Sequence, residues 1–135
     1  MKDDLKKIVI EDFESSCGTK LQNLQLSYQF FGRRFGTAPI ILINHALTGN
    51  SVVSGKDGWW SEIVGINRVI DLNKVTVLCI NIPGNGFNEE NFNFSVELNL
   101  GDIAHIFIKA LNKLKISKLY AIIGGSIGGC LTWEM

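Results

Sequence analysis

The sequence predicts an α/β fold, in which a mostly parallel sheet is covered on both faces and an antiparallel hairpin precedes it. Three short segments, 40–43, 75–80 and 119–123, are apolar at nearly every position, as expected of strands that are buried on both sides. A segment with helical spacing of its apolar residues separates the last two. The 135 residues are enough for one domain with one core.

Two segments ahead of the first buried strand predict the hairpin. Ile8–Ile10 is a short apolar run, and from residue 24 to residue 30 apolar and polar residues alternate strictly. A period of two is typical of a strand with one face on the core and one in solvent. Gly32 and Gly36 then mark a turn before the first fully apolar strand.

The connections between the buried strands contain the predicted loops and helices. We expect a long loop at 44–58, a short helix at 59–65 and a turn at 71–74. Asn99 has the position of a helix N-cap, and Asp102 follows near the positive end of the helix. The apolar residues that predict this helix are Leu100, Ile103, Phe107, Leu111 and Leu114. A further helix is expected after Ser126.

Composition excludes several classes of partner. The hydrophobic content is 46% and the formal net charge is zero, so no basic surface for nucleic acid is expected. No run of eighteen apolar residues predicts a membrane span, and the first residues do not form a secretory signal. Cys17, Cys79 and Cys130 lack metal-ligand spacing and are interpreted as core residues of a cytoplasmic protein without metal or permanently bound cofactor.

Parallel sheets place their active sites beyond the carboxyl ends of the strands, where loops at 45–58, 83–92 and 124–129 are expected to meet. The last of these reads Gly124-Gly125-Ser126-Ile127-Gly128 and fits G-x-S-x-G between a strand and a helix, the pattern of a nucleophile elbow. There a strained backbone exposes Ser126, and the glycines let the helix pack close to the strand. The amide of Ile127 would face an oxyanion.

The glycine cluster has other interpretations. A tight turn that holds an ordinary serine is the simplest of them. A Rossmann phosphate loop requires glycine where Ser126 stands, and a Walker loop requires Gly-Lys-Ser/Thr, which is absent. The strand before and the helix after Ser126 favour the elbow.

Three segments together carry a family resemblance. They are NHALTGNS at 44–51, GWW at 58–60 and IIGGSIGG at 122–129. The chain resembles the homoserine O-acetyltransferases of the α/β-hydrolase fold, in register from about residue 40 onwards. The resemblance implies that acetyl-CoA acylates Ser126 and that the hydroxyl of L-homoserine accepts the acetyl group, in methionine biosynthesis. It also implies an oxyanion hole formed by the backbone amides of Leu47 and Ile127, and it is compatible with a homodimer.

The remaining candidates are assigned in the same way. His45 precedes the serine, whereas the triad of this fold runs Ser, Asp or Glu, then His, so the resemblance makes His45 a structural residue of its loop. His105 is expected in solvent and Cys130 in the core. Asn50, Trp59 and Trp60 are candidate substrate contacts, and Ser51 could also reach a substrate. The alternative for Asn50 and Ser51 is ordinary turn chemistry, and the alternative for the two tryptophans is anchoring of the core.

The triad acid and base are therefore expected beyond Met135. Residues 1–135 are interpreted as the amino-terminal part of a single α/β-hydrolase catalytic domain, ending just after the elbow, inactive alone and with strand 119–123 at an open edge. The alternatives are a serine ester or thioester hydrolase, and an inactive fragment or interaction module. The loop NIPGNGFNEENF at 81–92 is shorter than the glycine-rich loop of the family, so the choice of acetyl or succinyl donor and of the acceptor stays open.

Overall fold

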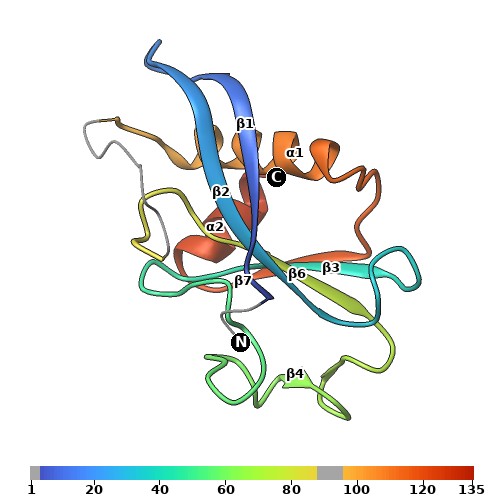
Figure 1. Ribbon diagram of the computed structural model, residues 1–135. Helices are drawn as coiled ribbons and strands as arrows, with labels where there is room; N and C mark the ends of the chain where they lie inside the picture. The colour runs from blue at the N-terminus through green and yellow to red at the C-terminus, as the bar shows by residue number, and fades with distance from the viewer. Residues whose placement is uncertain (1–3, 88–95) are drawn as a thin grey trace.

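A computed structural model describes residues 4–87 and 96–135, and it contains one five-stranded sheet (Figure 1). The strands of this sheet are β1 (Lys6–Glu14), β2 (Lys20–Gly32), β3 (Ile40–Asn44), β6 (Thr76–Ile80) and β7 (Ala121–Gly124). They lie in the order β1-β2-β6-β3-β7. Strands β6, β3 and β7 are parallel, whereas β2 runs antiparallel to both β1 and β6. The expected sheet with an antiparallel hairpin at its front is confirmed.

The hairpin strands are longer than the sequence predicted, and β2 is more deeply buried. Ser27 and Gln29 were expected on a solvent-facing side, but both are buried. The reason is that β2 lies between β1 and β6, and hydrogen bonds join its polar side chains to the loops that follow β3 and β6. The alternating pattern identified the strand correctly but gave the wrong environment for its polar positions.

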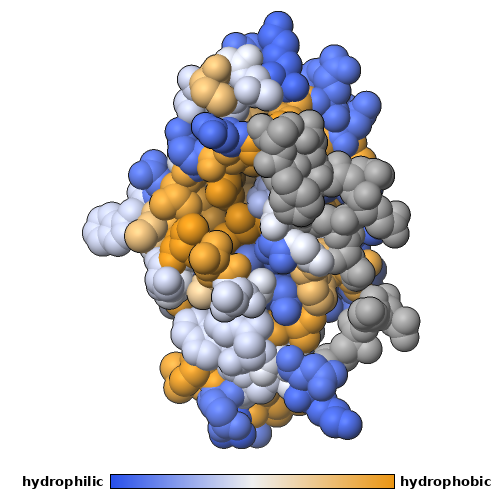
Figure 2. All heavy atoms as spheres, turned by 90° about the vertical axis from the view of Figure 1, so that its left-hand side faces the viewer, coloured by the Kyte–Doolittle hydropathy of each residue, from blue (hydrophilic) through white to orange (hydrophobic). Residues whose placement is uncertain are grey.

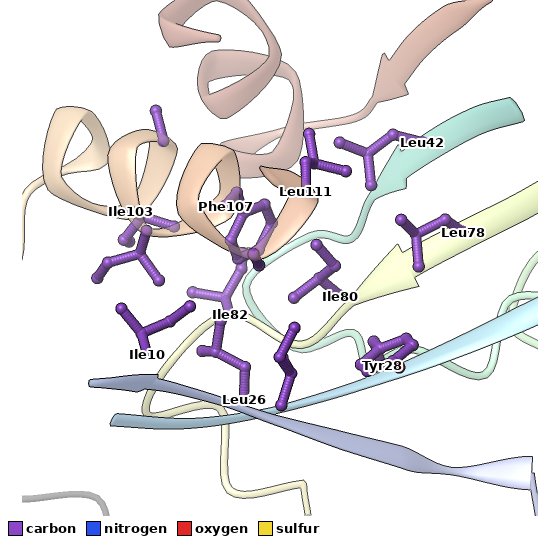
Figure 3. Packing of buried hydrophobic residues seen from close by; sticks show 14 of the residues in the cluster. Ile10, Leu26, Tyr28, Leu42, Leu78, Ile80, Ile82, Ile103, Phe107 and Leu111 are labelled. Atoms are coloured by element: carbon purple, nitrogen blue, oxygen red, sulfur yellow. The ribbon is translucent and has the colours of Figure 1, made fainter. Parts of the chain in front are cut away.

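Helices cover one face of the sheet and pack with it to form the larger of two apolar clusters. They are α1 (Leu100–Lys113) and α2 (Ile127–Glu134). Figure 3 shows Phe107 and Leu111 of α1 directed at Leu42 and Ile80 on the sheet. Phe107 and Leu42 are fully buried, and burying side chains of this size contributes on the order of 1.5–3 kcal/mol each. This packing fixes the strand ends relative to the helices.

An irregular segment covers the other face of the sheet. Val53, Val64 and Ile70 pack there against Ile43 and Val77. The helix expected at 59–65 is absent; turns lead instead into β4 (Val64–Gly65), which pairs in parallel with β5 (Ile70–Asp71).

The hydrogen bonds explain why the helix expected at 59–65 does not form. The amides of Trp59 and Trp60 donate to the carbonyls of Val52 and Val53, and the amide of Ile70 donates to Ile63. These bonds bring the segment against neighbouring loops and replace the repeating bonds of a helix. The turn expected at 71–74 is present, closed by the amide of Lys74 on the carbonyl of Asp71.

The predicted start of α1 is confirmed. The Asn99 side chain accepts from the amide of Asp102 at 2.9 Å, and the Asp102 carboxylate accepts from the amide of Asn99 at 3.1 Å, which forms a capping box. Asp102 is buried, and it also accepts from the amide of Ser16 at 2.8 Å. One carboxylate therefore caps α1 and attaches the β1–β2 turn to it.

Two of the three cysteine assignments are wrong. Cys79 is buried in the sheet, and burial raises the pKa of its thiol far above the usual range, but Cys17 and Cys130 are exposed. Cys17 lies in the β1–β2 turn. Cys130 lies on α2, whose buried residues are Gly128 and Leu131, so its side chain leaves the opposite face of the helix. Within residues 4–87 and 96–135, no helix has the length and apolar run needed to cross a bilayer.

Candidate functional site

Ser126 occupies a strained position between β7 and α2. Its backbone has φ 56° and ψ −130°, a conformation that residues other than glycine rarely adopt. Such a conformation costs on the order of 1–3 kcal/mol, and it persists only where the surrounding packing imposes it. The residue is exposed, and its hydroxyl makes no capping bond to the helix. The hydroxyl is therefore accessible at the tip of the turn.

The glycines beside Ser126 explain how this position is enforced. A Cβ on Gly124 would lie 2.2 Å from the carbonyl oxygen of Gly128, so the strand and the helix touch through their backbones. A Cβ on Gly128 would lie 2.2 Å from the carbonyl oxygen of Asn44 and 2.6 Å from that of His45. The close approach that the sequence predicted is present at these two glycines, whereas Gly125 faces open space. Gly128 also brings the start of α2 against the end of β3.

Leu47 lies in a tight turn just after this contact. The amide of Gly49 donates to the carbonyl of Ala46 at 2.8 Å, which places Leu47 at the second position of a β-turn. Its side chain is 72% exposed. Within residues 4–87 and 96–135, the amides of Leu47 and Ile127 donate no backbone or side-chain hydrogen bond. Both amides are thus available donors, one on each of the two segments that Gly128 brings together.

His45 is unsuited to act as a base. Its side chain is completely buried, and both ring nitrogens are engaged. Nε2 accepts from the amide of Ile82 at 3.0 Å, so the proton lies on Nδ1, which donates to the carbonyl of Ala46 at 2.7 Å. Burial lowers the pKa of the imidazole, although the bond to Ala46 opposes the shift. The ring is a neutral link between the loop after β3 and the loop after β6.

His105 and the two tryptophans are the next candidates by position. His105 is exposed on α1, where it lines a groove beside the β1–β2 hairpin together with Glu14 and Lys109. Trp59 and Trp60 stack with ring centroids 5.3 Å apart; Trp60 packs against the apolar cluster on the loop-covered face of the sheet, and Trp59 is 40% exposed. Trp60 thus anchors the core, and the substrate contact of Trp59 stays a prediction.

Asn50 is engaged in ordinary turn chemistry, because its side-chain oxygen accepts from the amide of Val52 at 2.8 Å. Ser51 is fully buried and bonds inward, where its hydroxyl donates to Gln29 at 2.6 Å. Substrate contact through the Ser51 hydroxyl is therefore incompatible with this arrangement. Nothing in the described residues places Asn50 against a substrate.

A set of buried and partly buried polar residues beneath the loops was missed by sequence reasoning. We call it the amide network, and its members are Ser27, Gln29, Ser51, Asn81 and Asn85. Asn81 lies at its centre, 1% exposed, with bonds to Ser27, Ser51 and Asn85. A signal was present, since Asn81 directly follows the buried strand β6. An asparagine at the carboxyl end of a buried strand needs partners there.

The described parts of the loops that follow β3 and β6 lie on the same side of the molecule as the β7–α2 turn. Strands β3, β6 and β7 all end on the left-hand side of Figure 1. Figure 2 looks onto that side and shows apolar residues gathered in one area, with polar side chains around it.

Comparisons with known proteins agree with this architecture. Residues 39–135 match the family model described as the alpha/beta hydrolase fold, so the chain belongs to the α/β-hydrolase fold family. The curated homoserine O-acetyltransferase of Pelagibacter ubique (strain HTCC1062) is 34% identical over 97% of this chain and 41% of its own length. The chain therefore spans about two fifths of that relative. The resemblance to homoserine O-acetyltransferases that the sequence motifs predicted is confirmed.

Solved structures give the same picture. The crystal structure of homoserine O-acetyltransferase from Staphylococcus aureus superposes with a TM-score of 0.84 and 29% identity, over 96% of this chain and 41% of that one. The crystal structure of esterase E22 superposes with a TM-score of 0.79 and 23% identity, over 92% of this chain and 41% of that one. The second likeness shows the fold alone, because the identity is low.

Proposed function

We propose that residues 1–135 form the amino-terminal part of a single catalytic domain that transfers an acetyl group from acetyl-CoA to the hydroxyl of L-homoserine. The observation that carries this choice is the similarity, over 97% of the chain, to a relative named homoserine O-acetyltransferase. The strained, exposed serine between β7 and α2 supports the chemistry that the choice requires. The turn is, in this proposal, a nucleophile elbow.

The first half-reaction forms an acetyl-enzyme. The Ser126 oxygen attacks the thioester carbonyl, its proton passes to a general base, and a C–O bond forms as the carbonyl oxygen becomes an anion. The tetrahedral intermediate then collapses, the C–S bond breaks, and CoA leaves as the thiol after it gains a proton. The exposed position of Ser126 suits this step, because the substrate carbonyl must approach the hydroxyl from outside the protein.

Two backbone amides are proposed to stabilise the oxyanion. The Leu47 amide lies on the loop after β3, and the Ile127 amide opens α2 directly after the nucleophile. Both are free of partners in the described residues, and the positive end of α2 adds to the favourable potential. Removing one such donor typically costs about 2.7–4 kcal/mol of transition-state stabilisation.

The second half-reaction regenerates Ser126. The homoserine hydroxyl attacks the acetyl carbonyl, the bond to the Ser126 oxygen breaks, and the serine recovers a proton. The base in both halves is proposed to be a histidine outside the described residues, oriented by an acidic residue, in the order usual for this fold. The two histidines of this sequence do not fit, since His45 is buried with both nitrogens engaged and His105 lies on α1 by the hairpin.

The setting of the reaction follows from the same proposal. Acetyl-CoA serves as a co-substrate, with no permanently bound cofactor and no metal. The product enters methionine biosynthesis in the cytoplasm, and the complete protein is proposed to be a homodimer that binds neither nucleic acid nor membrane. Asn50, Trp59 and Trp60 remain proposed substrate contacts.

A serine ester or thioester hydrolase is the second candidate. Its chemistry is identical up to the acetyl-enzyme, and only the attacking group differs, water in place of homoserine. The observation that favours it is the loop that begins at Asn81, which is shorter than expected of the acetyltransferases.

Partitioning of the acetyl group separates the two candidates. The complete protein is incubated with acetyl-CoA, with and without L-homoserine, and CoA, acetate and O-acetylhomoserine are quantified; succinyl-CoA is tested in parallel. The transferase predicts CoA release beyond one equivalent per enzyme only with homoserine, and this further CoA equals the O-acetylhomoserine formed. CoA release that yields acetate at a rate independent of homoserine would contradict it and favour the hydrolase.

A further inference from the structure

Asn81 lies where two loops of the proposed site meet. It follows the last residue of β6, and all of its side-chain hydrogen-bonding capacity is used. Its oxygen accepts from the amide of Ser51 at 2.7 Å and from the Asn85 side chain at 3.1 Å. Its nitrogen donates to the hydroxyls of Ser27 at 2.8 Å and Ser51 at 2.9 Å. A carboxamide with two acceptor and two donor bonds has one allowed orientation.

These bonds hold the far end of the turn that carries Leu47. Asn81 holds the amide of Ser51, and Asn85 donates to the carbonyl of Gly49 at 3.3 Å. The near end is held by His45, through the bond from the amide of Ile82. The turn from Ala46 to Gly49 is thus held at both ends by hydrogen bonds to the loop after β6.

We propose that Asn81 is a positioning residue for acyl transfer: it fixes the Leu47 amide in the place that the oxyanion requires. This inference rests on the proposed function. Asn81 touches no reacting atom, and it acts through Ser51 and Asn85 on the backbone of the loop. The need for such a device is physical, because an exposed turn without anchors would sample many positions of its amide, and a donor stabilises an oxyanion only when it is pre-placed.

The network also explains why polar side chains are buried in β2. Gln29 accepts from the Ser51 hydroxyl at 2.6 Å, which leaves the Ser51 oxygen free to accept from Asn81. Burying these groups would be costly without partners, and together they satisfy one another. Hydrogen bonds from the side chains of β2 thus support the loops after β3 and β6.

The test uses the complete protein with three single variants. Asn81→Ala removes the central side chain, and Asn85→Ala removes the tether to Gly49 from a less buried position. Thr76→Val is the matched control, because Thr76 is a buried residue at the opposite end of β6 and donates one hydrogen bond of 2.8 Å to the carbonyl of Arg33. Each is made with Leu47 intact and with Leu47→Pro, which lacks the amide hydrogen.

The rate of acetyl-Ser126 formation in a single turnover and the Kd for CoA are measured. Asn81→Ala is expected to slow acetylation by about 10–100-fold with the Kd for CoA unchanged, since a misplaced donor loses part of what a missing donor loses. In the Leu47→Pro background, Asn81→Ala should slow acetylation by less than about three-fold, because the amide hydrogen that Asn81 positions is already absent. Thr76→Val should leave the acetylation rate within about two-fold in the Leu47 background.

Additive losses in the two backgrounds would overturn the inference, as would a weaker Kd for CoA with an unchanged acetylation rate. If Asn81→Ala does not fold, Asn85→Ala is judged by the same criteria. Without acetylation of Ser126 in the unmodified protein, the proposed function itself fails. With normal acetylation there, and Asn81 and Asn85 variants that behave like Thr76→Val, only the role of Asn81 fails.

Discussion

At the scale of single residues, the proposed chemistry depends on backbone groups as much as on side chains. The Leu47 side chain is 72% exposed and its amide is unpartnered within the described residues, so its contribution should come from the amide alone. The turn can accept a proline, because the second position of a β-turn suits its fixed φ. Side-chain and backbone contributions can therefore be separated at this one position.

We predict that Leu47→Ala keeps most of the transferase activity of the complete protein and that Leu47→Pro loses about 100–1,000-fold in kcat, as for a deleted oxyanion donor. Steady-state kinetics with acetyl-CoA and L-homoserine give the comparison, and circular dichroism checks the fold. Equally mild effects of the two substitutions in folded proteins would remove Leu47 from the oxyanion hole.

His45 makes stability depend on pH in a defined direction. Burial lowers the pKa of the folded-state imidazole, so between that pKa and the unfolded value of about 6.5 the unfolded chain binds more protons than the folded one. The stability is fully present above the unfolded pKa and is lost as the pH falls towards the folded pKa. The loss has a limiting slope of about 1.4 kcal/mol per pH unit.

We predict that the free energy of unfolding of the complete protein falls below about pH 6.5 and that His45→Gln removes this component. Glutamine keeps an acceptor for the amide of Ile82 but does not titrate. Urea titrations between pH 5 and pH 8 measure the effect, and His105→Gln on the exposed face of α1 serves as the control. An unchanged slope in His45→Gln, with the slope lost in His105→Gln, would contradict the assignment.

Residue-level prediction from the sequence succeeded where a local pattern carries the signal and failed where distant contacts decide. The strained backbone at Ser126 and the cap at Asn99 follow from motifs a few residues long. The burial of Gln29 does not, because it depends on Ser51, which approaches through a loop far along the chain. The same reason hid the central position of Asn81.

At the scale of elements, β7, α2 and the end of β3 form one tight contact through glycines. Gly128 has backbone atoms of Asn44 and His45 within 2.2–2.6 Å of where a Cβ would stand, and backbone cannot move aside as a flexible side chain can. Gly125, three residues earlier, has no atom within 4 Å of that position. The two glycines therefore provide a matched comparison within one motif.

We predict that Gly128→Ala displaces α2 from β3, abolishes acetylation of Ser126 and lowers the melting temperature. Gly125→Ala should leave the melting temperature within a few degrees, because its Cβ meets nothing in the described residues. Thermal unfolding and acetylation by acetyl-CoA are measured for both in the complete protein. A Gly128→Ala protein as stable and as readily acetylated as the unmodified one would show that the close contact is not needed.

Elements with strong periodicity were predicted well. The three buried strands and α1 were found at nearly their observed positions, because each has an uninterrupted apolar pattern. The segment 59–65 was assigned to a helix and consists of turns leading into β4. The amides of Trp59 and Trp60 donate to residues 52 and 53, and the amide of Ile70 in β5 donates to the carbonyl of Ile63. Bonds between loops leave no periodic trace in a sequence.

At the scale of the whole molecule, the β7 edge of the sheet is open in the described residues. β7 is the terminal strand beside β3, and the aromatic side chains of Tyr120, directly before β7, and Trp133, on α2, are 73% and 93% exposed. An apolar edge strand with unpaired backbone groups is a template for pairing with another chain. The open edge expected at strand 119–123 is thus present, and large aromatic side chains accompany it.

We predict that residues 1–135 expressed alone associate through this edge and transfer no acetyl group. Size-exclusion chromatography with light scattering measures the association, and CoA release from acetyl-CoA measures the activity. The substitution Tyr120→Lys should reduce association, because charged residues protect sheet edges from pairing with other chains. A soluble monomer with steady turnover would contradict both the edge argument and the need for a base outside these residues.

Mass spectrometry after exposure of the complete protein to acetyl-CoA alone measures whether Ser126 carries the acetyl group. We predict an acetyl group on the peptide that contains Ser126, released as O-acetylhomoserine when L-homoserine is added, and ping-pong kinetics. Ser126→Ala should stay folded, lose the acetyl group and lose turnover by on the order of 10⁶-fold. Near-normal turnover in a folded Ser126→Ala protein, or an acetyl group found only elsewhere, would show that Ser126 is not the nucleophile.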